Sequence, residues 1–138
     1  MTQPEALLLE RLAVVLATSP AVPYLGLRGE IVDARVVVTL PGLEQHVGDA
    51  SRRSVHGGVL AAFLETAALA MLQAHGSDDP VTALSFTSAF VRPAQVVDTY
   101  AAVDVVRIGR RIAHVRVGAW QGDVDNFVAT GQGTFSLR

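Results

Sequence analysis

The sequence predicts an α+β fold in which one antiparallel sheet wraps around a long apolar helix. Two observations predict it. Residues 56–76 are almost entirely apolar and consist mostly of good helix formers. Four β-like runs with short turns follow, and no second helix is visible among them. Because the chain has 138 residues, of which 50% are hydrophobic, we expect a single domain over residues 1–138.

Three segments precede the long helix. Residues 4–18 carry leucines at helical spacing and end at a Ser-Pro pair, which predicts a short amphipathic helix. Residues 24–40 are rich in Val and Ile and predict one or two strands, with a break near Arg28 and Gly29. Residues 41–55 are polar without a sustained period, so we expect a long loop there.

The segment 56–76 has apolar residues at almost every position. A helix without a polar face is expected to be covered on most sides, and Gly76 is placed to end it.

The strands that follow are expected to pair as antiparallel hairpins because the turns between them are short. One face of the first strand is expected to carry Leu84, Phe86 and Phe90, and one face of the third Ala113, Val115 and Val117. Gly131 and Gly133 should share a face with Phe127 and Phe135, and glycine inside a strand marks a bend or the close approach of another element. The four expected strands are residues 81–92, 96–107, 111–120 and 126–137.

Composition excludes several classes of function. The chain has no cysteine, which removes disulfides, thiolate metal sites and thiol nucleophiles. The formal net charge of −2 argues against nucleic-acid binding, which usually needs a strongly basic face. No metal site is expected, since the histidines lack metal-ligand spacing; they are His46, His56, His75 and His114.

The N-terminus predicts a cytoplasmic protein. Glu5 and Glu10 stand where a secretory peptide would carry a basic start and a long apolar run. No uninterrupted apolar stretch approaches the length of about 18 residues that spans a bilayer, so no membrane partner is expected.

Glu65 is the first candidate for chemistry. It is the lone carboxylate in the apolar helix, and Glu is rarely buried without a partner or a purpose. Burial is expected to raise its pKa and make it a better base. The alternative is that Glu65 faces solvent, and that Thr66 beside it is an ordinary helix residue.

The run His56-Gly57-Gly58 at the start of this helix is the second candidate. Unpaired amides at a helix N-terminus carry partial positive charge, and glycine lets a ligand approach them closely. Such amides suit a developing oxyanion. The same residues could instead form a flexible turn with a capping histidine.

The spacing of the two candidates predicts a dimer. His56 and Glu65 are separated by about 2.5 turns, so they lie roughly 13 Å apart on opposite faces of a regular helix. If both belong to one site, a two-fold dimer has to bring one chain's helix start near the other chain's carboxylate.

Arg107, Arg110 and Arg111 cluster at an expected hairpin turn. Arginine offers paired donors that suit phosphate, so this cluster is a candidate for holding a phosphorylated ligand, the alternative being a solvated turn.

The run HGGVLAAFLETAALA, the strand end FVRPA and the hairpin VVRIGRRIAHV together resemble the hotdog-fold acyl-CoA thioesterases of the phenylacetate-degradation type. The resemblance covers about residues 24–137. It implies a hotdog fold, dimers that pair their sheets edge to edge, often two dimers per tetramer, and an active site across the dimer interface. It implies no cofactor other than the coenzyme A of the substrate.

By this resemblance, Glu65 stands where the family places its catalytic Asp or Glu, and Gly57 where it places the amide that polarises the carbonyl. His56 matches the motif histidine that positions the thioester. The family often has an asparagine and a glycine where this chain has Ala50 and Arg53.

A water-holding hydroxyl of the family aligns with Ala83, which leaves Thr82 or Ser85 as substitutes. Gly58 and Thr66 are the further residues expected to touch substrate. Arg92 joins the cluster Arg107, Arg110 and Arg111 as a candidate for the CoA phosphates.

The sequence therefore predicts an enzyme that hydrolyses an acyl-CoA thioester. A non-catalytic acyl-CoA or acyl-chain binding protein of the same fold is the first alternative, which Ala50 and Ala83 favour. A hydratase is disfavoured because its Gly-Asp-x-Asn-Pro motif is missing, and a structural domain without a small-molecule site is the last alternative.

Overall fold

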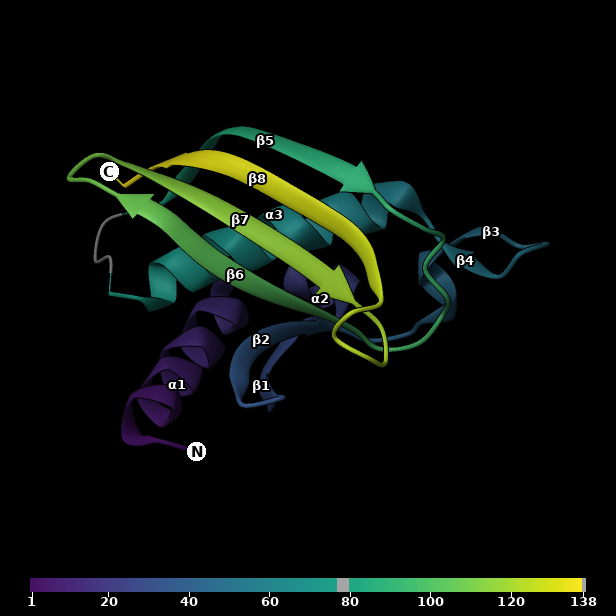
Figure 1. Ribbon diagram of the computed structural model, residues 1–138, viewed down its shortest axis with the longest axis horizontal. Coiled ribbons are helices and arrows are strands. Elements are labelled where there is room, and N and C mark those ends of the chain that lie inside the picture. Colours follow the sequence, from purple (N-terminus) through teal and green to yellow (C-terminus); the bar gives the residue numbers. More distant parts are fainter. Residues whose placement is uncertain (77–79, 138) are drawn as a thin grey trace.

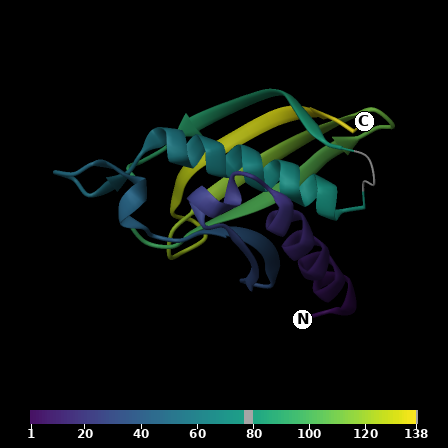
Figure 2. The same ribbon diagram turned by 180° about the vertical axis from the view of Figure 1, so that it is seen from behind.

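The structure is a computed structural model that describes residues 1–76 and 80–137. Six antiparallel strands form one curved sheet in the order β1-β2-β6-β7-β8-β5. The long helix α3 lies across one face of this sheet, and α1 packs beside it on the same side (Figures 1 and 2). The strands are β1 (Arg28–Val32), β2 (Arg35–Leu40), β5 (Thr82–Phe90), β6 (Thr99–Ile108), β7 (Ile112–Trp120) and β8 (Phe127–Ser136). The predicted α+β fold, with an antiparallel sheet wrapped on a long helix, is confirmed.

The helix α1 (Gln3–Thr18) confirms the first predicted element. Its start is a capping box, in which the Thr2 hydroxyl accepts from the Glu5 amide and the Glu5 carboxylate accepts from the Thr2 amide. Leu12 is fully buried and lies so close to Gly29 that a β-carbon there would meet its side chain at 2.7 Å. Glycine at position 29 thus lets α1 approach β1.

The prediction for residues 24–40 was correct in part. Two strands are present, but the chain before them forms the short helix α2 (Val22–Leu25). The strand break at Arg28 and Gly29 was wrong, because these residues belong to β1. The turn lies at Asp33 and Ala34, whose φ angles of 50° and 62° are both left-handed, as a two-residue hairpin turn requires.

Residues 41–55 are more ordered than the predicted loop. They contain the short helix η1 (Glu44–His46) and a small hairpin of β3 (Val47–Asp49) and β4 (Ser54–Val55). This hairpin leads directly into α3 and fixes where that helix begins.

The helix α3 (Gly57–Ala74) begins at the predicted position, with His56 as N-cap, His75 as C-cap and Gly76 after it at φ 114°. More than half of it is buried inside the domain. It is long and apolar enough to cross a bilayer, but that burial is the pattern of a core helix in a soluble protein. The buried residues are Val59, Leu60, Phe63, Leu64, Ala67, Ala68, Ala70, Met71, Leu72 and Ala74.

Two of the predicted C-terminal hairpins are confirmed, β6–β7 and β7–β8, whereas the hairpin expected between β5 and β6 was wrong, because β5 pairs with β8 at the edge of the sheet. Phe86 explains two glycines of β8. A β-carbon at Gly131 or Gly133 would come within 2.6 Å of the Phe86 ring. The close approach predicted at these glycines is therefore that of Phe86. Two face assignments were wrong: irregular pairing beside Leu84 and beside Phe127 shifts both side chains, so that Leu84 is exposed and Phe127 covers Gly118.

Candidate active site

The N-terminus of α3 presents one free backbone amide. The His56 carbonyl accepts from the amides of Val59 and Leu60 at 3.0 and 3.1 Å, and the His56 ring accepts from the amide of Gly58. Among the described residues, no acceptor faces the amide of Gly57. The partial positive charge of the helix end is therefore available to a ligand at Gly57, whereas the Gly58 amide is already engaged.

The ring of His56 has a defined role in this arrangement. Its Nδ1 accepts from the Gly58 amide at 2.8 Å, so in this geometry the ring proton is on Nε2. The backbone of His56 is also fixed, since its amide donates to the carbonyl of His46 at 2.8 Å. Gly48 passes so close that a β-carbon there would meet His56 at 2.8 Å. The site thus holds an oriented Nε2–H donor at the mouth of the helix start, one residue before the free amide of Gly57.

Two cavities flank the first turns of α3. The acyl-side cavity, as we call the larger one, has a volume of about 440 Å³, and the Arg92-side cavity has about 370 Å³. Helical spacing puts Gly58 and Ala62 on one side of α3 and Gly57 and Leu60 on the other, so the two cavities open on opposite sides. The acyl-side cavity is lined by Ala21, Tyr24, Leu25, Gln45, Val47, His56, Gly58, Val59 and Ala62. The Arg92-side cavity is lined by Ser54, Val55, Gly57, Leu60, Phe90, Val91, Arg92, Pro93 and Ala94.

Glu65 is exposed in the single chain. The expectation that it would be buried within its own subunit was wrong, because the side of α3 that carries Gly58, Ala62 and Glu65 faces away from the sheet core. The predicted separation from the helix start stands. Gly57 and Glu65 are eight residues apart on one regular helix, or about 12 Å along its axis, so a single chain does not bring them together.

The strand β5 is an edge of the sheet and lies beside the amide end of α3. Within residues 1–76 and 80–137 its one pairing partner is β8. Phe90 at its end would contact a β-carbon at Gly57 at 3.6 Å, which puts edge and helix start next to each other. Large apolar side chains are exposed on this edge, with Leu84 at 59%, Phe90 at 57% and Val91 at 51% exposed. An open edge with exposed apolar residues is a surface that soluble proteins usually cover.

The four candidate arginines lie at two ends of the molecule. Arg92 lines the Arg92-side cavity together with Gly57, and its guanidinium donates to the side chain of Asn126 at 2.8 Å. Arg107, Arg110 and Arg111 are exposed at the β6–β7 hairpin, at the opposite end of the sheet from the start of α3 (Figure 1).

The remaining candidates are more scattered. Thr66 is half-buried on α3, and Thr82 and Ser85 are exposed on β5. Ala83 is partly buried and packs against the core, and Ala50 is exposed in the turn between β3 and β4.

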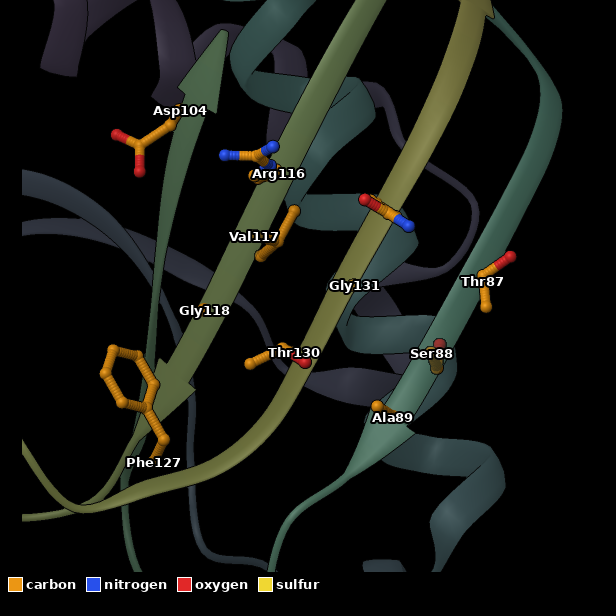
Figure 3. A pocket seen from close by; sticks show the side chains of 11 residues that line it. Thr87, Ser88, Ala89, Asp104, Arg116, Val117, Gly118, Phe127, Thr130 and Gly131 are labelled. Atoms are coloured by element: carbon orange, nitrogen blue, oxygen red, sulfur yellow. The ribbon is translucent and has the colours of Figure 1, made fainter. Parts of the chain in front are cut away.

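Sequence reasoning missed two hollows. Tyr24 was not predicted to line the acyl-side cavity, because its segment was predicted to be a strand. A second hollow, of about 410 Å³, lies on the face of the sheet opposite α3, where Figure 3 shows Arg116, Phe127 and Thr130 around it. No period or motif marks these residues, which are far apart in sequence and meet only through strand pairing.

A sheet wrapped on a long helix, whose amide end opens onto cavities, defines a hotdog-fold protein of the thioesterase class. The family model of the thioesterase superfamily matches residues 53–127, which is more than half of the chain. The chain belongs to this superfamily, and membership supports thioester hydrolysis as its general class of activity. No curated protein matches it.

Solved structures share the fold over nearly their whole length. A protein from Chromobacterium violaceum is 26% identical, with 99% of this chain and 98% of that chain covered and a TM-score of 0.75. A Shewanella oneidensis protein related to the thioesterase superfamily is 23% identical, with both chains fully covered and a TM-score of 0.76. A phenylacetic acid degradation-related protein from Ralstonia eutropha is 22% identical, with 91% and 98% covered and a TM-score of 0.75.

Proposed function

We propose that this protein hydrolyses acyl-CoA thioesters to a free acid and coenzyme A, at a site that two copies of the chain complete together. The observation that carries this proposal is the free amide of Gly57 at the start of α3, directly after His56, whose Nδ1 caps the helix. A free amide at the positive end of a helix suits the oxygen of a thioester carbonyl as it gains negative charge, and the Nε2–H of His56 is the second donor in this proposal.

The carboxylate has to come from a second subunit. Glu65 of the same chain is about 12 Å from Gly57, and it is exposed on the side of α3 that faces away from the sheet core. If two β5 strands pair about a two-fold axis, the two α3 helices lie side by side and antiparallel, so that Glu65 of each faces the amide end of the other. A homodimer is therefore part of the proposal, and a tetramer of two such dimers is its extension.

The chemistry follows from these groups. Glu65 takes a proton from a water molecule as that water attacks the carbonyl carbon, or attacks the carbon itself and is released by water in a second step. In either route the carbon–sulfur bond breaks and the thiolate of coenzyme A leaves and is protonated. The Gly57 amide holds the negative oxygen of the intermediate, and Arg92 receives a phosphate of coenzyme A. No metal or further cofactor takes part in this scheme, and a cytoplasmic location suits its substrate.

The test compares the wild type with Glu65→Gln on a panel of acyl-CoAs, following thiol release with a chromogenic reagent. Because Glu65 is exposed in the single chain, the variant should fold normally, and we expect kcat to fall by about 10² to 10⁴ with little change in KM. Glu10→Gln, an exposed helical glutamate of α1, is the matched control and should leave kcat unchanged. Equal hydrolysis by the wild type and Glu65→Gln would remove Glu65 from the mechanism.

A non-catalytic acyl-CoA binding protein is the second candidate. Ala50 and Ala83 favour it, because neither can hold a water molecule with its side chain. Calorimetric binding of an acyl-CoA by the wild type, without thiol release from any member of the panel, would select it.

A further inference from the structure

We propose that the acyl-side cavity receives the acyl arm of the thioester, that it selects uncharged apolar acyl groups, and that Ala62 sets the length of chain it accepts. This inference rests on the proposed function and names the substrate class of the same site.

The chemistry of the cavity wall sets the charge of its occupant. Apart from His56 at its mouth and the amide of Gln45, the lining side chains are hydrocarbon or the ring of Tyr24, and none is a carboxylate, a lysine or an arginine. An acyl chain ending in a carboxylate would lose its hydration there and find no cation, which costs several kcal/mol. A volume of about 440 Å³ is within the usual range for small-molecule sites.

The outer wall is held in place before any ligand arrives. The carbonyl of Tyr24 accepts from the side chains of Gln45 and His46 at 2.7 and 3.2 Å, which ties α2 to η1. The Tyr24 ring stands edge-on to the buried ring of His46, with centroids 5.8 Å apart, while remaining 56% exposed itself. Leu25 and Val59 are buried at 2% and 7% exposed. The cavity is therefore a fixed hollow with an aromatic rim.

The inner wall is shaped by two small residues of α3, Gly58 and Ala62, one turn apart. Gly58 has no room for growth, since a β-carbon there would meet the His56 ring at 3.0 Å. Ala62 is exposed toward the cavity side, so a larger side chain at this position would project into the cavity without displacing the core. Ala62 is thus the position that limits the length of the acyl chain.

The other arm of the thioester leaves on the opposite side. Gly57 lines the Arg92-side cavity, and the acyl-side cavity begins at His56 and Gly58. A carbonyl held at the Gly57 amide can therefore send its acyl group toward Ala62 and its sulfur arm toward Arg92. This division makes the two arms separable by experiment.

The experiment crosses two variants with two substrate series. Straight-chain acyl-CoAs of increasing length are compared with the matching N-acetylcysteamine thioesters, which lack the nucleotide and its phosphates. Ala62→Leu should lower kcat/KM for the longest good substrate at least about tenfold more than for the acetyl thioester, in both series. Arg92→Ala should affect the CoA series alone. Ala13→Leu, at an exposed helical alanine of α1, is the control and should change neither.

A binding measurement separates failure of this inference from failure of the proposed function. Unreactive S-alkyl-CoA thioethers of increasing length are titrated calorimetrically into the wild type, Ala62→Leu and Tyr24→Ala. Loss of affinity that grows with chain length supports the cavity assignment even without turnover, and Tyr24→Ala covers the case in which Ala62→Leu fails to fold. The inference is overturned if both variants lower the affinity for thioethers of every chain length by the same factor, or if neither variant lowers the affinity for any of them. It is equally overturned if succinyl-CoA is turned over and bound as well as butyryl-CoA.

Discussion

The two functions of the His56 side chain can be separated by one pair of substitutions. In the structure its Nδ1 caps α3 by accepting from the Gly58 amide at 2.8 Å, which leaves Nε2–H as the donor that the proposed mechanism uses on the thioester oxygen. The oxygen of an asparagine side chain occupies nearly the same place as Nδ1, and Asn is a favourable N-cap residue. His56→Asn should therefore keep the cap and lose the donor, whereas His56→Ala should lose both.

The expected magnitudes differ enough to be measured. Loss of an N-cap costs about 1 kcal/mol, which for a chain of this size lowers Tm by roughly 3–5 °C in His56→Ala. His56→Asn should unfold within about 1 °C of the wild type. Loss of an oxyanion donor lowers kcat about 10² to 10³-fold, and both variants should show it. Calorimetry and the thiol-release assay provide the two readouts. A His56→Asn variant with wild-type kcat would show that this histidine acts only as a helix cap.

Three further outcomes follow from other parts of the structure. Leu84→Lys, on the open β5 edge, should leave the single chain folded but convert a dimer to monomers in sedimentation analysis and abolish hydrolysis. A variant that stays dimeric contradicts pairing through this edge. Gly133→Ala puts a β-carbon 2.6 Å from the Phe86 ring and from a backbone carbonyl oxygen. The free energy of unfolding measured in urea should therefore fall by about 1–3 kcal/mol. An unchanged unfolding midpoint would contradict the close packing of Gly133 against Phe86. The hydrogen bond from Arg53 lowers the pKa of Glu44 below its usual 4.5. The stability contributed by this pair is therefore present above that pH and is lost as the pH falls through the lower pKa of the folded state. Carboxyl NMR of Arg53→Gln should show the Glu44 pKa rising back toward 4.5, and no rise would refute the pairing.

The long helix and the four strands after it could be predicted because their signals are local. Segment 56–76 is apolar over its whole length, and the later strands are separated by Gly and Pro turns. The α2 helix could not be predicted, because four residues carry too little pattern and form a helix here only through packing and the anchoring of Tyr24. Likewise, the hairpin turn at Asp33 and Ala34 uses a left-handed alanine, which no turn rule favours.

The candidate site was predictable in its parts but not in its surroundings. The spacing of His56, Gly57 and Glu65 on one helix is a property of the sequence, and the structure retains it. The cavities could not be predicted from the sequence, since the acyl-side cavity combines α2, η1, β3 and α3, which meet only through tertiary packing. The engagement of the Gly58 amide by its own N-cap also depends on a side-chain rotamer that the sequence does not reveal.

The exposure of Glu65 is where the sequence pattern and the single chain differ most. A surface helix normally turns charged residues toward water, yet the exposed strip of α3 offers Gly58, Ala62 and half-buried Leu69 around one carboxylate. Gly58 and Ala62 line the acyl-side cavity, so the part of the strip left for a second subunit to cover is that around Glu65 and Leu69. The apolar composition of α3 on all sides therefore suits an assembly in which this strip is covered. The Glu65 carboxylate, which the sequence predicts to be removed from water, would be removed from it only when a second subunit covers it. The Leu84→Lys and Glu65→Gln variants together test this role of Glu65: both should lower kcat at least about 10²-fold, but only Leu84→Lys should separate the dimer into monomers.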